Sequence, residues 1–592
     1  MQRAVRAVLP GVHTAMGYQR AWLWSDLRAG VVLSALLIPA GMGYAVASGL
    51  PAYTGLYATI VPLIAYAIFG PSRILVLGPD SSLAPIIAAA IIPLAVGDSD
   101  HAVALAGLLA IMVGILLFVG GLLRLGFLTS LLSKPIQIGY LNAIALIVLV
   151  SQIPGLLGFS SSGAALAERV TGIVRAVTNG EVQVIPALIG FGSILVMLFF
   201  KWVIRQAGLG ILLAVLVASV ITAVWQLGGV IPVVGPMPGG LPTPALGGLA
   251  WGDVGMLVAP ALGLALIAFA DTSVLSRTMA ARRGESVDGS REMIGLGIAN
   301  AAGGAFGGFP ISASTSRTPV AEQAGSKTQF TGVVGAVAVL LFMLVVPGVT
   351  AYLPNAALAA VVIVAASSLI DVPAYVRLWR NDPPEAVLSS FAFVGVFLVG
   401  VLEGIVLAIV LSFVAMAWRV SRPYRAELGH VRGLRGYHDV TRHEAERIDG
   451  VVIARFDAPL FFANASLFTD FMRRTVDAAV NAAALEGRPA IETVILASEP
   501  ITDIDSTAMD EILTLDTYLS ARGMKLIFAE MKGPVRDHFA NYELVQRFPP
   551  DRFAPTVGAA VDAITGQLRT DIAGPDVLGT DGSDRDRRLP EG

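Results

Sequence analysis

The chain has 592 residues, of which 55% are hydrophobic and only 14% are charged, whereas soluble proteins carry about 25% charged residues. The apolar residues come in repeated runs of roughly 16–24, the length of a membrane-spanning helix. The chain has no cysteine, which excludes disulfides, thiolate metal sites and cysteine nucleophiles. We therefore predict a multi-spanning membrane protein without a cofactor, and no triad, metal cluster or phosphate loop in the sequence indicates an enzyme.

Residues 1–30 read as a basic, cytoplasmic lead-in, and residues 31–419 as an all-α polytopic membrane domain. We expect about fourteen hydrophobic segments in this domain. They begin near Val31, Thr54, Ser81, Val103, Phe127, Val184, Gly210, Gly255, Ile294, Ser314, Gly332, Ala356, Ala386 and Gly404.

Basic residues are concentrated in alternate loops, and the positive-inside rule assigns those loops to the cytoplasm. The set comprises Arg73, Arg124, Lys201, Arg205, Arg282, Arg283, Arg291, Lys327, Arg377 and Arg380. Both termini then lie in the cytoplasm, and the expected location is the inner (plasma) membrane.

Two short segments in the membrane part resemble each other. LGPDSSLAPIIAAA, at 77–90, and GGFPISASTSRTPVAE, at 307–322, both contain the pattern Ser-x-x-Pro. The pattern begins at Ser82 and again at Ser316, 234 residues later, which is about half of the membrane part. This offset predicts a repeat of seven plus seven segments, the second copy inverted. Short, proline-interrupted segments at matching positions indicate the binding site of a transporter.

A helix that starts in mid-membrane presents free N–H groups and a partial positive charge, so two such starts favour an anion. Arg317 strengthens this hypothesis, because a charge near the bilayer centre costs about 2.5–3.5 kcal/mol and usually has a task. The alternatives are a surface arginine or a pair with Glu322, serines that only pack or cap, and Asp80 as a helix cap. The predicted anion-binding residues are Ser81, Ser82, Ser314, Thr315, Ser316 and Arg317.

Asp271 ends a long uncharged run that follows Asp253, so we expect it well inside the membrane. A carboxylate there can bind a proton or Na⁺ and change charge as the carrier moves. Asp271, with the adjacent Thr272, is therefore the predicted ion-coupling site, with Na⁺ at Asp271 as the one metal considered. The alternative is a structural partner for Arg277 or Arg317. Asp80 is a second candidate carboxylate for this role, although its position at the helix start fits a cap better.

The pattern changes after the membrane part. Residues 420–448 are polar and basic and read as a linker. In residues 449–569 the short runs VVIARF, TVILAS and KLIFAEM alternate with helical patterns, which predicts an α/β domain with a helix-covered sheet. Residues 570–592 are rich in Asp, Gly and Arg, and we predict a disordered tail.

Three regions together resemble the SulP family of sulfate permeases and anion exchangers. GLPAYTGLYATIVPLIAYAIFGPSRILVLGPDSS is similar to the family's signature region, GGFPISASTSRT to its tenth-segment motif, and the soluble part to a STAS domain. The resemblance implies a core and a gate domain, an elevator-like step, and an anion held between the third and tenth half-helices.

The resemblance also implies roles for single residues. Ser316 and Arg317 match the family's Ser-Arg pair at the anion site, and Asp271 matches an acidic position linked to Na⁺ or H⁺ symport. Tyr44 is expected to line the same pocket. The chain departs from many relatives at Ala40, where they carry a glutamine after the first-span proline, which leaves the substrate open.

In the STAS-like domain, Asp505-Ser506-Thr507 matches the segment that is phosphorylated in anti-sigma-antagonist relatives. Ser506 is thus a candidate phosphosite, with an ordinary helix cap as the alternative. The domain is expected to support folding, dimer contacts or partner binding, and the expected assembly is a homodimer.

The prediction is secondary active transport of an inorganic anion, with sulfate first and H⁺ or Na⁺ as the coupling cation. The alternatives are a bicarbonate or dicarboxylate symporter and an uncoupled anion channel or exchanger. A nucleobase permease would need carboxylates placed for a base ring, and a membrane-bound sensor would use the STAS-like part as its output. The expected partners are the anion, the cation, the lipid bilayer and a second copy, and no nucleic acid.

Overall fold

The computed structural model describes residues 9–126, 133–159, 166–237, 242, 244, 246–314, 316–542 and 544–566. The chain divides into two compact units, Met1–Phe413 and Val414–Gly592. Thr315 and the predicted tail at 570–592 lie outside the described residues. Each unit is considered by itself.

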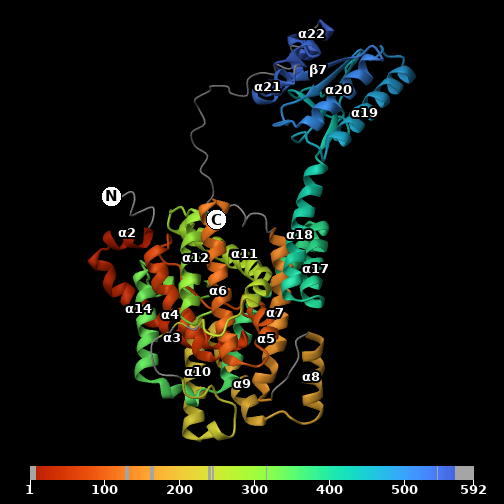
Figure 1. Ribbon diagram of the computed structural model, residues 1–592. Helices are drawn as coiled ribbons and strands as arrows, with labels where there is room; N and C mark the ends of the chain where they lie inside the picture. Colours follow the sequence, from red (N-terminus) through yellow and green to blue (C-terminus); the bar gives the residue numbers. More distant parts are fainter. Residues whose placement is uncertain are drawn as a thin grey trace, which may run out of the picture. The chain divides into compact units, whose positions relative to one another are not determined.

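The first unit is built from helices (Figure 1). Two short helices, α2 (Pro10–Met16) and η1 (Arg20–Trp22), precede the main series. That series is α3 (Leu23–Ala47), α4 (Ala52–Phe69), α5 (Ala84–Ala95), α6 (Ser99–Leu122), α7 (Lys134–Leu157), α8 (Leu166–Thr178), α9 (Val184–Phe199), α10 (Ala207–Val224), α11 (Trp251–Arg282), α12 (Gly289–Ala305), α13 (Arg317–Gln323), α14 (Phe330–Val345), α15 (Asn355–Ser367), α16 (Val372–Asn381), α17 (Pro383–Leu398) and α18 (Val401–Ser421). Among the described helices, seven are long and apolar enough to cross a membrane.

The predicted hydrophobic segments correspond to α3–α7, α9–α15, α17 and α18. The sequence did not predict α8 and α16 as helices. Both are short and amphipathic, and α8 carries Glu168 and Arg175 within thirteen residues. Such helices lie below the hydropathy of a spanning segment, although their period is helical.

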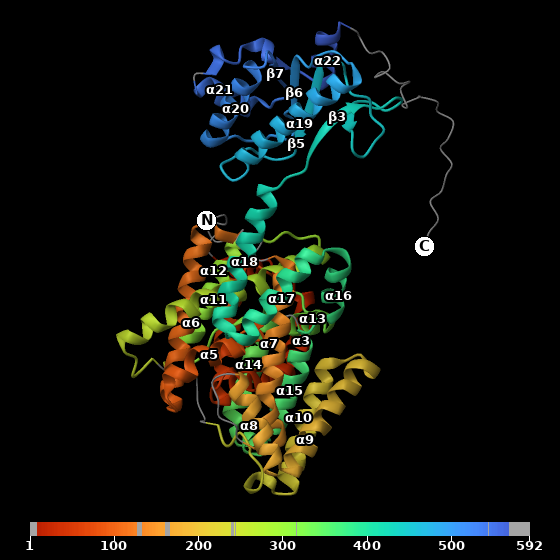
Figure 2. The same cartoon turned by 90° about the vertical axis from the view of Figure 1, so that its right-hand side faces the viewer.

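The helices pack in two groups. In the first, α12 packs against α6 and α4, α14 packs against α3 and α4, and α5 and α11 pack on α6 and on each other. In the second, α7 packs against α15 and α17, and α9 packs against α10 and α15. Figure 2 labels the members of both groups except α4, which Figure 1 labels. Glycines allow close approach within the first group: a Cβ at Gly304 would lie 2.4 Å from the carbonyl oxygen of Gly107, so α12 and α6 meet backbone to backbone.

Two of the helices are much shorter than their neighbours. α5 has 12 residues and α13 has seven. Each follows a two-residue strand, β1 (Leu77–Gly78) before α5 and β2 (Ser312–Ala313) before α13. The matching pieces predicted from the sequence are therefore extended at first and become helical only a few residues later.

The second unit contains a six-stranded sheet in the order β4-β3-β5-β6-β7-β8. β5 (Val451–Phe456), β6 (Thr493–Ala497) and β7 (Lys525–Ala529) are parallel, and β8 (Phe553–Ala554) extends them. They match the three runs predicted as strands. The helices are α19 (Ala465–Glu486), α20 (Ser506–Ser520), α21 (Gly533–Asn541) and α22 (Val557–Thr565).

Alternate residues of β5 serve the two faces of this sheet, as the period of two requires. Val452 and Ala454 pack in one core with α19 and α20, whereas Val451 and Ile453 pack in the other with α22. Burial on both faces explains why these strands read as continuous apolar runs. Figure 1 shows helices on this unit's sheet.

The expected linker at 420–448 needs correction. It contains β3 (Arg425–His430) and β4 (Tyr437–Asp439), and β3 pairs antiparallel with both β4 and β5. The sheet therefore begins well before residue 449. The strand was missed because β3 carries charged residues; Glu427, for example, pairs with Arg447 at 2.7 Å. An antiparallel strand with charged residues on it does not produce an apolar run.

Candidate functional site

The two short strands bring the matching motifs together. β1 and β2 pair antiparallel, with Leu77 opposite Ala313 and Gly78 opposite Ser312. The Ser314 amide also donates to the carbonyl oxygen of Val76 at 3.0 Å. The segments that start α5 and α13, 234 residues apart in sequence, therefore form one hydrogen-bonded unit inside the membrane part.

Arg317 crosses from the second motif to the first. Its side chain is 1% exposed, and Nη2 donates to the carbonyl oxygen of Pro79. Among the described residues, neither Nε nor Nη1 of Arg317 has a hydrogen-bond partner. Glu322, the alternative partner, pairs instead with Arg282 at 3.3 Å. The site therefore holds a buried cation with donors left to offer.

Gly78 makes room for this guanidinium. Its φ is 151°, and a Cβ at this position would lie 3.0 Å from Nη1 of Arg317. A side chain at residue 78 would thus be strained and would press on the charge. Tyr44, on α3, is buried and lies within electrostatic range of Arg317 and Asp80, which places it at the predicted pocket.

Asp271 and the serines of the first motif also meet. Ser81 and Ser82 are 6% and 1% exposed, and the Ser82 hydroxyl donates to Oδ2 of Asp271 on α11 at 2.8 Å. The predicted anion site and the predicted ion-coupling residue are therefore in direct contact. Sequence spacing alone did not give this contact, because it depends on how α11 packs on α5.

Asp80 has a different place from the expected one. The N-cap residue of α5 is Leu83, and no side chain caps this helix. Oδ1 of Asp80 accepts from the Ser82 amide at 3.2 Å and also lies 3.2 Å from the Ser82 hydroxyl oxygen. The prediction that Asp80 caps the helix was wrong. Asp80 was also not among the predicted residues of the anion site, and it was only the second candidate for ion coupling. The sequence did contain an indication of this role: besides Asp271, Asp80 is another acidic residue in an apolar domain, and it lies within one of the two matching motifs.

Fewer backbone N–H groups at the starts of α5 and α13 are available to an anion than the sequence predicted. The amide of Ala84 donates to the carbonyl oxygen of Asp80 at 3.2 Å, and the amide of Thr318 donates to Ser314 at 3.2 Å. The amide of Arg317 donates to the Ser314 hydroxyl at 3.3 Å. These donors are occupied within the chain, so the positive contribution comes chiefly from the Arg317 side chain.

Two threonines hold the strand pair in place. Thr318 Oγ1 accepts from the amide of Val76, and Thr272 Oγ1 accepts from the amide of Ala313, both at 3.1 Å. Thr272, predicted to take part in ion coupling, is therefore seen fixing β2 to α11. Both threonines are fully buried.

The remaining serines differ in exposure. Ser314 is 1% exposed, whereas Ser316 is exposed at the N-cap of α13, and their hydroxyl oxygens are 3.2 Å apart. Ser312 is fully buried, and its hydroxyl has no partner among the described residues. In the second unit, Ser506 is exposed as the first residue of α20, where Asp505 is the cap and accepts from Ala508 at 2.8 Å.

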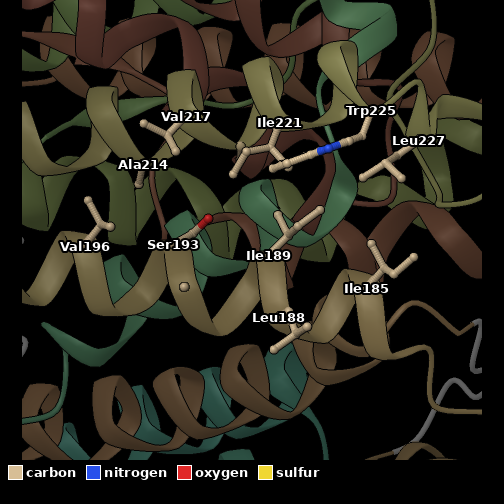
Figure 3. A pocket seen from close by; sticks show the side chains of 12 residues that line it. Ile185, Leu188, Ile189, Ser193, Val196, Ala214, Val217, Ile221, Trp225 and Leu227 are labelled. Carbon is tan, nitrogen blue, oxygen red and sulfur yellow. The ribbon is translucent and has the colours of Figure 1, made fainter.

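The cleft between α9 and α10 in Figure 3 has a different chemistry. It encloses about 420 Å³, and its lining side chains are aliphatic except for Ser193 and Trp225. An anion needs a charge or convergent donors, which this lining lacks. Within the described residues no group of three or more His, Asp or Glu side chains could hold a metal ion.

A paired set of half-helices with a buried arginine, inside a polytopic helical unit, defines a membrane transporter for anions. Residues 23–392 match the model of the sulfate permease family, and residues 442–560 match the STAS domain. A probable sulfate transporter of Mycobacterium tuberculosis (strain CDC 1551 / Oshkosh) is 36% identical over 557 residues, which cover 94% of this chain and 97% of the relative. The chloroplastic sulfate transporter 4.1 of Arabidopsis thaliana is 30% identical over 92% of this chain and 81% of the relative. The chain therefore belongs to the sulfate permease family.

Solved structures have the same fold. The murine Solute Carrier 26 family member A9 anion transporter, in its inward-facing state, has a TM-score of 0.84 at 21% identity over 96% of this chain and 95% of that one. The transmembrane domain of the cyanobacterial bicarbonate transporter BicA has a TM-score of 0.56 at 23% identity, covering 67% of this chain and 98% of its own. The family consists of transporters and not of enzymes.

Proposed function

We propose that the protein carries out secondary active transport of an inorganic anion, with sulfate as the first candidate and H⁺ or Na⁺ as the coupling cation. The buried Arg317 carries the proposal, because it keeps Nε and Nη1 without a partner among the described residues. A buried charge of this kind is costly unless it has a counter-charge, and a bound anion supplies one. Sulfate is preferred because relatives that span the whole chain are named as sulfate transporters.

The anion lies, in this proposal, between the starts of α5 and α13. Arg317 supplies charge and donors, Ser81, Ser314 and Ser316 supply hydroxyls, and Tyr44 lines the pocket from α3. Charge-assisted hydrogen bonds from a guanidinium are stronger than neutral ones and suit a tetrahedral oxyanion. Ala40 has no polar side chain to contact an anion, so the alternatives to sulfate stay open.

Coupling is assigned to Asp271. Its contact with Ser82 at 2.8 Å connects the anion site to a carboxylate that can be neutralised by a cation. An anion and a cation that each reduce the other's electrostatic cost bind cooperatively, and this is the requirement for symport.

Movement is assigned to the first helix group as a core domain and to the second as a gate. Of the elements of the site, α3, α5 and α11 belong to the first group, and α13 packs against α3, so a step of this group would carry the intact site across the membrane. This elevator-type scheme goes with an inverted repeat of seven plus seven segments. Cytoplasmic termini, the inner membrane and a homodimer complete the proposal.

Purified protein in liposomes, with labelled sulfate and an imposed H⁺ or Na⁺ gradient, tests the function. We expect sulfate to accumulate above its external concentration under one of the two gradients. Asp271→Asn should abolish accumulation, because an amide cannot exchange a charge, while downhill sulfate exchange continues. Asp253→Asn, which alters the carboxylate that caps α11, is the matched control.

The outcomes separate the candidate substrates. Uptake of bicarbonate or a dicarboxylate without sulfate uptake would support the proposed anion site but contradict sulfate as its substrate. Sulfate flux that never exceeds equilibrium under either gradient would indicate an uncoupled channel or exchanger. Unchanged accumulation by Asp271→Asn would remove this residue from coupling.

A further inference from the structure

The Ser82 hydroxyl lies between two carboxyl groups. Its oxygen is 2.8 Å from Oδ2 of Asp271 and 3.2 Å from Oδ1 of Asp80. A serine hydroxyl has one hydrogen to donate and two lone pairs that accept. It therefore donates to only one carboxylate at a time. The second contact is a hydrogen bond only when the other carboxyl carries a proton and donates it to Ser82.

Both contacts of the Ser82 hydroxyl are thus hydrogen bonds when the two carboxyl groups together carry one proton. With both groups ionised, one of them faces the lone pairs of Ser82 Oγ in a serine that is 1% exposed. That contact is repulsive, and water does not reach the buried Ser82 to relieve it. Two acids held this close do not both ionise easily.

Arg317 connects this pair to the anion. It lies within electrostatic range of Asp80, and its Nε and Nη1 have no partner among the described residues. With both carboxyl groups ionised, the three side chains sum to about one negative charge, which repels an anion. One proton makes them neutral, and a second makes them positive.

The other ionisable groups near the two carboxyl groups do not change this sum of charges. Tyr44 faces Asp80 from α3, and Tyr140 faces Asp271 from α7. Tyrosine hydroxyls are neutral near pH 7. On α6, the ionisable residues are Asp100 and His101, in its first turn. Among the described neighbours, Arg317 is therefore the cation that Asp80 faces, and Asp271 is connected to it through Ser82 and Asp80.

We propose that Asp80 and Asp271 share a proton through Ser82, and that this proton sets the charge that the anion meets at Arg317. The inference rests on the proposed function and narrows it: the coupling ion is a proton, and Asp80 is a second coupling carboxyl group. By linkage, a proton that strengthens anion binding is itself bound more tightly when the anion is present. Anion and proton then move together.

The dependence on pH has a definite sign. As pH falls the pair gains protons, the negative charge at the site decreases, and the KM for sulfate falls. As pH rises the KM increases, by about tenfold per pH unit where one proton is linked to one anion. Asp80→Asn removes one of the two charges, and its amide oxygen still accepts from the Ser82 amide.

Sulfate uptake by Asp80→Asn liposomes, measured from pH 5.5 to 8.5, tests the proposal. At pH 8.5 we expect a KM about tenfold below that of the unmodified protein, because one negative charge is missing. At pH 5.5, where the carboxyl groups carry protons, the two KM values should agree within about twofold. Asp98→Asn is the matched control, since it changes the net charge equally at the exposed cap of α6 and asparagine caps as well.

A KM profile of Asp80→Asn that coincides with the unmodified protein at every pH would overturn the inference, as would a KM that depends on Na⁺ and not on pH. If Asp80→Asn does not fold, Ser82→Ala replaces it. Proton uptake on sulfate binding, followed with a pH dye in weakly buffered detergent, should then fall at least twofold; unchanged uptake overturns the inference.

Asp271→Asn distinguishes the two proposals. Accumulation that persists in Asp271→Asn contradicts the proposed function, whatever Asp80 does. Accumulation lost in Asp271→Asn, together with an unaltered KM profile in Asp80→Asn, leaves the proposed function standing and removes only the shared proton.

Discussion

The two arms of the site, residues 77–95 with β1 and α5 and residues 312–323 with β2 and α13, look alike in sequence but differ in chemistry. The first carries the acidic Asp80 and sends Ser82 to Asp271. The second carries Arg317, which reaches back to the carbonyl oxygen of Pro79. A shared pattern of serine and proline thus gives a shared backbone shape. In the mechanism we propose, the charged residue that differs between the arms lets the second arm attract the anion and the first hold the coupling proton.

Removing the charge of the second arm should have the largest effect. Arg317→Gln keeps a hydrogen-bond donor but loses the cation, so kcat/KM for sulfate should fall on the order of a hundredfold. Arg317→Lys keeps the charge without the planar fork and should recover only part of the loss. The measurement is initial uptake into liposomes.

Arg282→Gln is the control for Arg317→Gln. It removes an exposed cation on α11 that pairs with Glu322, and Glu322 lies on the same helix as Arg317, α13. Its uptake should stay near that of the unmodified protein. Equal losses in Arg282→Gln and Arg317→Gln would mean that only general charge matters, and the difference between the two arms would lose its meaning.

A smaller effect on sulfate transport is expected from a change at Gly78, where the first arm leaves space for the Arg317 side chain of the second. Gly78→Ala adds a Cβ 3.0 Å from Nη1 of Arg317 at a φ of 151°, so the guanidinium must move. We expect a KM for sulfate about tenfold higher, from a strain of roughly 1–3 kcal/mol. Gly97→Ala, at a φ of 86° with nothing within 4 Å, has backbone strain without the collision. Equal KM values for the two variants would contradict a role for space beside Arg317.

The smallest effects should come from the hydroxyl groups that hold the arms together. Thr318→Val and Thr272→Val each leave a buried amide, of Val76 or Ala313, without its acceptor. Each should lower the free energy of unfolding by about 1–3 kcal/mol, seen as a lower Tm in detergent. Thr278→Val, at an exposed threonine bonded to Val274 of its own helix, should change the Tm little. A Tm loss in Thr278→Val as large as in the buried pair would show that strand pairing is not what these threonines stabilise.

Much of the fold followed from local patterns. Apolar runs of spanning length predicted the helices of the first unit, and alternation of apolar strands with helices predicted the α/β unit, because burial on both faces makes β5, β6 and β7 apolar throughout. The boundary at residue 449 did not follow, since β3 is a charged antiparallel strand that is recognisable only by its pairing with β5. α8 and α16 were missed because amphipathic helices lack the hydropathy of a span.

By itself, the sequence determined the class of protein, the two matching motifs and the presence of Arg317 and Asp271 in an apolar domain, because charge, length and spacing are local properties of the chain. Only the tertiary structure decided that Ser82 joins Asp271 to Asp80, that Arg317 turns toward Pro79, and that Thr272 fixes β2. These contacts join residues that lie up to 238 positions apart. They depend on the packing of α11, α5 and the strand pair, and no spacing in the chain encodes that packing.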